Sequence, residues 1–449
     1  MLVQFSITNF LSFREKTTFS MVKSKTAEGL PSHLFRATDS ISLLRGAAFY
    51  GANASGKSNF VKALAFAKKF ILDGLRPKES VPVESFRLDA ERFQSPSEFE
   101  FILFIEETFY TYGFRVDCER VHNEWLWTDA GSGDKLCFER TTDSAGKAHV
   151  EFGDSLSLER KASLQPTADR TRPNQLMLTK TLDDNQSDFE EVLEWFRNTL
   201  EIMTPATNDT FLEVLVLKKD SYTHYLAGTL NAVGTGITRI DIEKIPLEET
   251  ELNLREIREH IKNHIPTKAG DMTLTLLPDG RKILVDEDGR AYVLRMRTYR
   301  KNSTGEEVQF NPESESDGTK QFMNLHSILP ILHEGYRVFV IDEIERSLHS
   351  QLTRYFIELA LGDATPPPHS QLLFTTHDTN LIDTDLLRTD EIWFVEKDKG
   401  GASHLSALVE FKYPEGIDIE QGYLIGRFGA LPFLGNLRKL KNMAAQGEN

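Results

Sequence analysis

The chain has 449 residues, of which 40% are hydrophobic and 10% aromatic, and its formal net charge at pH 7 is −16. This length and composition predict an ordinary globular protein with a large core, divided into two or three domains. The negative charge argues against a protein that coats nucleic acid over its whole surface.

The first residues and the apolar runs bear on cellular location. Leu2 to Phe10 alternates polar and apolar residues, which predicts a strand and not a signal peptide. No apolar run approaches the roughly 18 residues of a membrane-spanning helix, so membrane association would need a partner. The two cysteines, Cys118 and Cys137, lack metal-ligand spacing and are predicted to be small buried side chains in a reducing compartment. We therefore expect a soluble, cytoplasmic protein.

A phosphate-binding loop follows a predicted N-terminal hairpin over residues 1–20. Gly51 to Ser58 reads GANASGKS, which fits the pattern G-x-x-x-x-G-K-[ST] at every position. An apolar strand, Leu43 to Phe49, precedes it, and a helix with one apolar face, Asn59 to Leu72, follows it. Strand, loop and helix stand in the order that this motif requires, although a surface turn can match the pattern by chance.

The residue types of the loop predict their partners. Lys57 is expected to reach the β- and γ-phosphates of ATP, and Ser58 to hold Mg²⁺, at a helix N-terminus that favours anions. The other predicted nucleotide-binding residues of this segment are Gly51, Asn53, Ala54, Ser55, Gly56 and Asn59.

The middle of the chain is predicted to be an inserted region between two parts of one ATPase head. Before it, Glu98 to Val116 predicts two strands around a turn near Glu106, and residues 160–175 predict a polar loop. The insertion is expected to begin with a helix, Asp188 to Met203. The predicted domains are residues 1–185, the insertion 186–312 and residues 313–449. Further predicted elements of the insertion are the helix Leu252–His264 and the strands Thr273–Leu277, Lys282–Val285 and Arg290–Thr298.

A basic run lies in the last of these strands. Strand alternation would place Arg295 and Arg297 on one face, with Arg300 and Lys301 close behind. Two interpretations stay open, a solvated strand face and a nucleic-acid contact.

Acidic residues follow an apolar strand after the insertion. Val338 to Ile341 predicts a buried parallel strand that delivers Asp342 and Glu343 to its carboxyl edge. Asp342 is expected to hold Mg²⁺ through its water shell, and Glu343 to orient or deprotonate the attacking water. The alternative for Glu343 is an exposed acid at a strand end.

Two further motifs stand on either side of this strand. Ser316-x-Gly318-Thr319 comes directly before a predicted helix and offers a second anion cradle, unless Ser316 only caps that helix. His377 ends the apolar strand of "SQLLFTTHD", where a neutral imidazole could donate to the γ-phosphate. A capping or core histidine is the alternative.

The order of these motifs resembles the ATP-binding-cassette (ABC) class of ATPases. The resemblance implies an α/β fold, an ABC-type P-loop ATPase head with a mixed β-lobe and a parallel-sheet core, plus the inserted α+β region. It also implies that the Ser-x-Gly signature of one subunit caps the γ-phosphate held by another. The expected assembly is therefore a homodimer or a higher homo-oligomer.

Longer stretches narrow the resemblance. "ITNFLSFREKTTFS" is similar to the opening of the chromosome-maintenance (SMC), RecF and overcoming-lysogenization-defect (OLD) ATPases. "IDEIERSLHSQLTRYFIELAL", "DEIWFVEKDKGG" and "YLIGRFGALPFL" resemble a bacterial family of transporter-like, AAA-type ATPases typified by AbiLi and RloA.

The sequence departs from the pattern of these families at two places. Ser350 stands where proline is expected, and residues 315–319 replace the signature sequence of the transporters. Gln94 is a candidate by position for the glutamine that links the lobes, and a surface loop is the alternative.

The resemblance implies a function in abortive infection, a form of anti-phage defence. Such ATPases act as nucleotide-dependent switches with an effector that carries a TOPRIM-type nuclease domain. Because the chain ends soon after Leu434, we expect the nuclease on another polypeptide. Two alternatives are a RecF-like or SMC-like ATPase that binds DNA and a transporter motor subunit.

Overall fold

The computed structural model of the chain forms two compact units. It describes residues 1–131, 133–205, 211–218, 220–250, 257, 273–277, 281–311, 314–362, 369–412 and 419–428. Unit 1 comprises Met1–Ile202, Gly335–Ile344 and Leu361–Asn449, and unit 2 comprises Met203–Glu334 and Glu345–Ala360. The chain therefore leaves unit 1 twice, and it returns first for the short segment Gly335–Ile344 and then again at Leu361. The predicted domain boundaries at residues 185 and 312 remain predictions.

The N-terminal half of unit 1 forms a seven-stranded antiparallel sheet in the order β10-β9-β8-β7-β6-β1-β2. The predicted hairpin and the predicted turn near Glu106 are both confirmed. Its strands are β1 (Leu2–Thr8), β2 (Thr17–Ser20), β6 (Ser97–Ile105), β7 (Thr108–Val116), β8 (Val121–Asp129), β9 (Lys135–Thr142) and β10 (Ala148–Phe152).

A six-stranded sheet in the order β11-β17-β18-β5-β19-β20 forms the second layer of strands. The four strands β17, β18, β5 and β19 pair in parallel, so their carboxyl ends meet at one edge. Every residue of β17, β18 and β5 is buried, which explains their apolar sequences. The strands are β5 (Gly46–Tyr50), β11 (Leu200–Met203), β17 (Val338–Ile341), β18 (Gln371–Thr375), β19 (Ile392–Lys397) and β20 (Ser403–Ala407).

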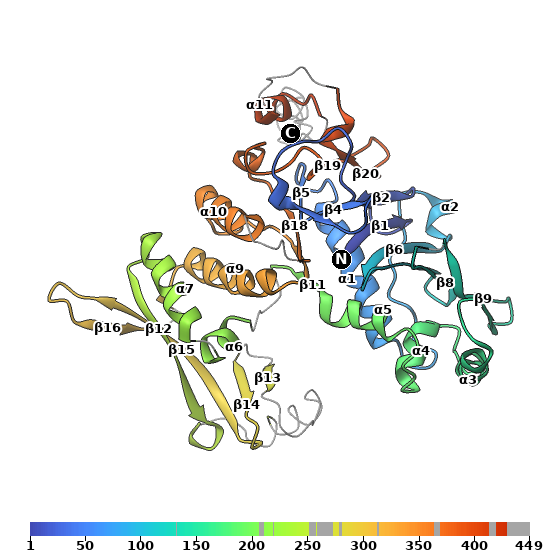
Figure 1. Cartoon of the computed structure of the whole chain (residues 1–449), viewed down its shortest axis with the longest axis horizontal. Coiled ribbons are helices and arrows are strands. Elements are labelled where there is room, and N and C mark those ends of the chain that lie inside the picture. Colours follow the sequence, from blue (N-terminus) through green and yellow to red (C-terminus); the bar gives the residue numbers. More distant parts are fainter. Residues whose placement is uncertain are drawn as a thin grey trace, which may run out of the picture. The chain divides into compact units, whose positions relative to one another are not determined.

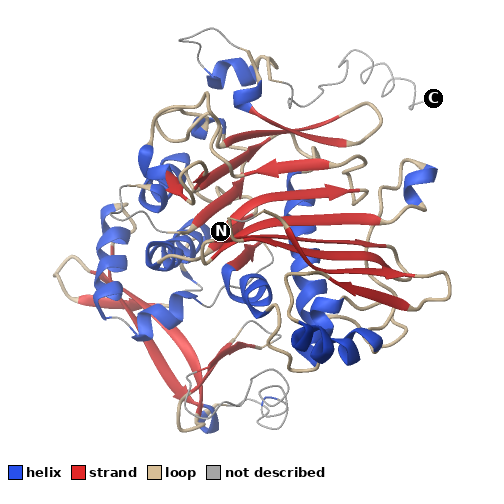
Figure 2. Ribbon diagram, turned by 45° about the vertical axis from the view of Figure 1, so that its right-hand side comes forward, coloured by secondary structure: helices blue, strands red, loops and turns tan. Residues whose placement is uncertain are grey.

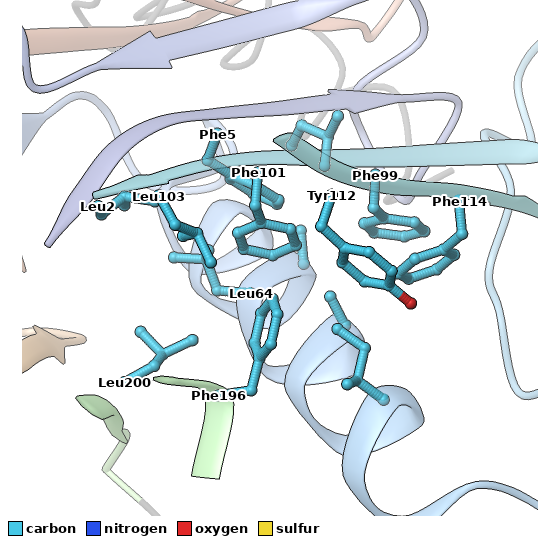
Figure 3. Close-up of a cluster of buried hydrophobic side chains, with 14 of the residues drawn as sticks. Leu2, Phe5, Leu64, Phe99, Phe101, Leu103, Tyr112, Phe114, Phe196 and Leu200 are labelled. Atoms are coloured by element: carbon cyan, nitrogen blue, oxygen red, sulfur yellow. The ribbon is translucent and has the colours of Figure 1, made fainter. Parts of the chain in front are cut away.

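Helix α1 (Lys57–Asp73) packs its predicted apolar face into the core between these strands. Phe60 of α1 lies 5.6 Å from Phe5 of β1, measured between ring centroids. Figure 3 shows side chains of β1 and β6 facing Leu64 of α1 and Phe196. The helix that begins with the phosphate-loop lysine is therefore fixed along its length by this core.

Short helices complete unit 1. They are α2 (Ala90–Phe93), α3 (Leu158–Asp169), α4 (Met177–Asp183), α5 (Glu190–Glu194), the π-helical turn η2 (Trp195–Thr199) and α11 (Ile419–Leu424). Turns of 3-10 helix lie at Pro31–His33, Thr379–Leu381 and Leu408–Glu410. A small hairpin pairs β3 (Leu34–Arg36) with β4 (Ser42–Leu44).

Four predictions about this unit need correction. The expected helix Asp188–Met203 ends at Thr199, because Leu200–Met203 joins the parallel sheet as β11 beside β17. The expected strand Leu43–Phe49 is divided at Arg45 between β4 and β5. The expected loop 160–175 is helical up to Asp169, with Ser157 accepting a hydrogen bond from the N–H of Arg160 as its cap. Of the two cysteines, Cys137 is buried as predicted, whereas Cys118 is exposed.

Unit 2 packs helices on one face of an antiparallel sheet in the order β12-β15-β14-β13, with β16 paired to β15 (Figure 1). In its core, Leu226 of α7 and Ile240 of β12 pack in one cluster with Phe322 of α9, the helix that follows the predicted Ser-x-Gly signature and is called the signature helix below. Figure 2 shows the helices in blue beside the red strands. The strands are β12 (Ile237–Pro246), β13 (Thr273–Leu276), β14 (Lys282–Val285), β15 (Ala291–Lys301) and β16 (Glu307–Phe310). The helices are α6 (Phe211–Lys218), α7 (Asp220–Ala232), α9 (Asp317–Glu334), α10 (Ser350–Leu361) and the 3-10 turn Leu247–Glu249.

The predicted strands of the insertion are confirmed, and β15 is three residues longer at its end than expected. The predicted helix Leu252–His264 lies, apart from Ile257, outside the described residues. In the part of the chain that the structure describes, no helix is both long and apolar enough to cross a membrane.

Candidate functional site

The phosphate loop connects β5 to α1 and depends on its two glycines. A Cβ atom on Gly51 would lie 2.3 Å from the carbonyl oxygen of Val395, and one on Gly56 would lie 2.3 Å from Ser403 Oγ. Gly56 also has a φ of 120°, which side chains rarely adopt. The loop can therefore close tightly only with glycine at both positions.

Lys57 points into this loop and touches His377. Its Nζ donates to the carbonyl oxygens of Gly51 at 2.6 Å and Ala52 at 3.1 Å, and it lies 3.3 Å from His377 Nδ1. An ammonium group has donors only, so Nδ1 must be the acceptor and the imidazole hydrogen sits on Nε2. His377 is exposed, so the predicted core-histidine alternative is wrong.

Ser58 and Asp342 meet at the carboxyl edge of the parallel sheet. Ser58 Oγ donates to Asp342 Oδ1 at 3.2 Å, and Thr375 Oγ1 donates to the same oxygen at 2.6 Å. Hydroxyl and carboxylate oxygens are the ligands that Mg²⁺ prefers, with water and phosphate oxygens filling the other positions. The two predicted metal-binding residues thus lie together in a chemically suitable pair.

Glu343 has an unusual backbone that a single threonine supports. Its φ is 56°, the left-handed region that a non-glycine residue rarely occupies. Its N–H donates to Thr375 Oγ1 at 2.8 Å, and the N–H of Ile344 donates to the carbonyl oxygen of Thr375 at 3.1 Å. Thr375 therefore orients both acids, a role that sequence analysis missed.

Two serines far apart in the sequence brace the other side of the loop. Ser403 Oγ lies 2.5 Å from the carbonyl oxygen of Ser55 and 2.8 Å from Ser12 Oγ. Asn59 Nδ2 donates to Ser12 Oγ at 2.8 Å, so this predicted nucleotide-binding residue holds the loop brace. Sequence analysis missed both serines, although Ser12 lies in the quoted opening motif.

The loop retains features of an anion cradle. Ser55 Oγ is buried and has no hydrogen-bond partner among the described residues. Asn53 and Ala54 form the exposed rim of the loop, and Ala54 has a φ of 62°. A polar ligand in the turn could therefore meet the Ser55 hydroxyl without displacing an existing protein bond to it.

A pocket of about 240 Å³ lies beside the loop, at Ser12 and Asn59. Its walls combine apolar and polar side chains, as a binding site for an aromatic, hydrogen-bonding group would. The remaining lining residues are Leu11, Glu84, Ser85, Phe86, Arg87, Leu88, Lys397 and Gly401.

The predicted signature residues belong to unit 2. Ser316 is exposed and caps α9, because its Oγ accepts from the N–H of Thr319 at 3.1 Å. The Thr319 hydroxyl lies 2.9 Å from the same oxygen. A Cβ atom on Gly318 would lie 2.6 Å from the carbonyl oxygen of Ser347, so glycine is required where the two backbones approach. Capping leaves the Ser316 hydroxyl at the exposed N-terminus of an 18-residue helix.

Other candidates from the sequence have ordinary surroundings. Arg297 of the basic run pairs with Glu243 at 2.7 Å, and Arg300 pairs with Glu315 at 2.6 Å. The run is thus partly neutralised, which favours the solvated strand face over nucleic-acid contact. Gln94 is exposed at the end of α2, as the surface-loop alternative predicted.

Taken together, the parallel strands, the loop and the two acids confirm the predicted fold class, an ABC-type P-loop ATPase head in which unit 2 is inserted. No curated protein sequence matches the chain.

Two solved structures are similar in fold with low sequence identity. The SMC head domain from Thermotoga maritima is 11% identical, with a TM-score of 0.36, and the match covers 90% of this chain and 98% of that one. The SMC head bound to the C-terminal winged-helix domain of ScpA is 13% identical, with a TM-score of 0.38 and coverage of 91% and 99%.

A family model matches residues 47–383, which include the phosphate loop, both acids, the signature and His377. It is described as "AAA domain, putative AbiEii toxin, Type IV TA system". Since the match spans well over half of the chain, the protein belongs to this AAA-domain family.

Proposed function

We propose that the protein binds ATP with Mg²⁺ and hydrolyses it, and that its nucleotide state acts as a switch in anti-phage defence. The observation that carries the ATPase proposal is the meeting of Lys57, Ser58, Asp342 and His377 at one sheet edge. These residues come from three separate segments of the sequence, so their meeting goes beyond the match of any single motif.

Each residue has a distinct task in this proposal. Lys57 exchanges its contacts with loop carbonyls for the β- and γ-phosphates, and Ser58 and Asp342 hold Mg²⁺, Asp342 through water. Bound ATP supplies an electrophilic γ-phosphorus. Glu343 orients and deprotonates the attacking water, and His377 donates from Nε2 toward the γ-phosphate. The pocket at Asn59 is suited to the nucleoside, because its lining residues Ser12 and Asn59 are the ones that brace the loop.

The proposed assembly is a homodimer with ATP between the subunits. Ser316 is exposed and Gly318 is half-buried at the start of α9, where a helix N-terminus attracts the γ-phosphate of a partner. Burying phosphates between two such cradles makes the closed dimer depend on nucleotide, which is the property of a switch.

The defence role rests on the AbiLi-like and RloA-like motifs and on the family description, which names a putative AbiEii toxin of a type IV TA system. We propose a separately encoded effector with a TOPRIM-like nuclease domain. A DNA-maintenance ATPase is the alternative, and binding of duplex DNA that weakens steeply with salt would favour it.

Measured binding and hydrolysis of ATP test the central proposal. Wild-type protein should bind Mg-ATP and release phosphate, and Lys57→Ala should abolish binding. The matched control is Lys62→Ala, which removes an exposed lysine from the same helix and should change neither property. Equal ATP affinity in Lys57→Ala and wild type would overturn the assignment of the loop.

A further inference from the structure

We infer that Arg300 of the inserted sheet is a positioning residue for the nucleotide-capping signature, acting through Glu315, the residue before Ser316. This inference rests on the proposed function, since it concerns the same composite site. It assigns the insertion a part in the reaction that the sequence motifs do not indicate.

The contact between the sheet and the signature segment is a double ion pair with a third hydrogen bond. Arg300 Nη1 donates to Glu315 Oε1 at 2.7 Å, and Nη2 donates to Oε2 at 2.6 Å. Thr298, two residues earlier on β15, donates to Oε1 at 2.6 Å. Glu315 is only 6% exposed and Thr298 is fully buried. Hydrogen bonds from Arg300, and then from Thr298, lower the pKa of Glu315, so its carboxylate is ionised at neutral pH.

Arg300 is itself held from two other directions. Its Nε donates to the carbonyl oxygen of Thr235 at 3.0 Å, in the turn between α7 and β12. Its guanidinium carbon lies 5.0 Å from the ring centroid of Phe310 on β16. One side chain therefore contacts a turn, a neighbouring strand and the signature segment, in addition to its own strand.

The geometry of the next residue explains why this clamp matters for capping. Glu315 points inward to Arg300, whereas Ser316 is exposed and begins α9. A buried carboxylate that loses its cationic partner is strongly destabilised, so the side chain is expected to turn toward solvent. If Glu315 turned outward, the adjacent Ser316 and the first turn of α9 could not keep their position. Bidentate pairing demands arginine, so lysine should restore the position only in part.

The first experiment measures the signature directly, in the full-length chain without nucleotide. Arg300→Ala should increase amide hydrogen exchange at residues 316–320 by at least about tenfold, and Arg300→Lys should have an intermediate effect. The matched control is Arg295→Ala on the same strand, an exposed arginine that should leave the exchange unchanged. If Arg300→Ala fails to fold, Thr298→Val replaces it and should increase exchange at the same amides. Unchanged exchange in every folded variant would overturn the inference.

The second experiment asks which subunit needs the clamp. A Lys57→Ala chain keeps its signature and a Ser316→Arg chain keeps its phosphate loop, so their mixture has one intact composite site per heterodimer. Arg300→Ala on the Lys57→Ala chain should reduce the ATPase rate of the mixture by at least about tenfold. The same change on the Ser316→Arg chain, whose signature is already inactive, should have no effect.

The outcomes separate this inference from the proposed function. An active mixture with equal losses from both placements, or with no loss from either, overturns the positioning role alone. An inactive reference mixture, when the wild type is active, overturns the composite site and the positioning role together. A wild type without ATPase activity overturns the proposed function, and the exchange experiment then still decides whether Arg300 holds the signature segment.

Discussion

At the scale of single residues, Glu343 combines a rare backbone conformation with a carboxylate in the predicted catalytic position. Glu343→Gln should keep ATP binding and slow hydrolysis at least about a hundredfold, because the base is lost while the phosphate and Mg²⁺ contacts remain. Equilibrium ATP binding and phosphate release measure the two effects. The exposed Glu287 provides the control, Glu287→Gln, and a wild-type rate in Glu343→Gln would refute the assignment.

Thr375 offers a test of the geometry, because its hydroxyl donates to the carboxylate of Asp342 and accepts from the backbone N–H of Glu343. Thr375→Val keeps the shape of the side chain and removes the hydroxyl that supports Asp342 and the N–H of Glu343. We expect a loss of at least about tenfold in kcat with the fold retained. Thr376→Val, the same change at the next buried threonine, should affect kcat less. Equal kcat values for wild type and Thr375→Val would show that this support is dispensable.

Residues in the motifs could be predicted because their spacing carries the information. Gly51, Lys57 and Ser58 lie within eight consecutive residues, and Asp342 follows a uniformly apolar strand. Thr375 and Ser403 could not be found in this way. A hydroxyl becomes a support only through the pairing of neighbouring strands, and nothing local in the sequence specifies that register.

At the scale of elements, the packing of α7 against α9 buries a histidine. His326 is fully buried between Tyr222, Tyr225 and Phe322, and its Nδ1 lies 3.3 Å from the Tyr222 hydroxyl. Burial lowers the pKa of His326 to about 4 from its usual 6.5. At a pH between these two values, His326 is therefore neutral in the folded protein and protonated in the unfolded chain.

This packing predicts how stability depends on pH. Between about pH 6.5 and 4 the unfolded state binds more protons at this position than the folded state, so stability falls as pH falls through that window. The full effect is about 3 kcal/mol. Unfolding by denaturant at pH 7.5 and pH 5 measures it, and His326→Gln should reduce the difference between the two pH values. His224→Gln, an exposed histidine of α7, serves as the control and should leave the difference as in the wild type.

Elements were predicted well where one period dominated, as in α1, whose apolar face is buried as expected. The expected helix Asp188–Met203 shows the limit of that argument. Its apolar residues continue past Thr199, yet β17 offers a sheet edge that Leu200–Met203 joins. Tertiary pairing overrides local periodicity there. The helix α3 was missed for the opposite reason, since its polar composition and Pro166 gave little periodic signal.

At the scale of the whole molecule, the central prediction is that ATP joins subunits. Pure Lys57→Ala and pure Ser316→Arg proteins should be inactive, and mixing them should restore about a quarter of the wild-type rate. Random pairing makes about half of the dimers heterodimers, each with one intact site. ATPase activity measured against mixing ratio gives the result. An active, strictly monomeric wild type, or an active Ser316→Arg protein, would contradict the shared site.

The split of the chain between two units was only partly accessible from the sequence. An insertion between the phosphate loop and the acidic strand could be predicted, because the motifs of one site stand far apart. The return of the chain to unit 2 after Ile344 could not be predicted, because residues 338–360 have the pattern of one strand followed by one helix. One contact of the returning segment is the close approach of Ser347 to Gly318, which involves backbone atoms and cannot be recognised from side-chain types.

That backbone contact has a consequence for how two nucleotide sites communicate. Ser347 lies four residues after Glu343, the proposed base for the nucleotide of its own chain, whereas Gly318 belongs to the cradle that we propose is offered to the partner. Because a Cβ atom on Gly318 would lie only 2.6 Å from the Ser347 carbonyl oxygen, the two backbones are close, and we expect a change around one chain's proposed base to affect the neighbouring proposed site. The dimer should therefore show cooperative kinetics, with a Hill coefficient for ATP above one that falls toward one in heterodimers with a single intact site.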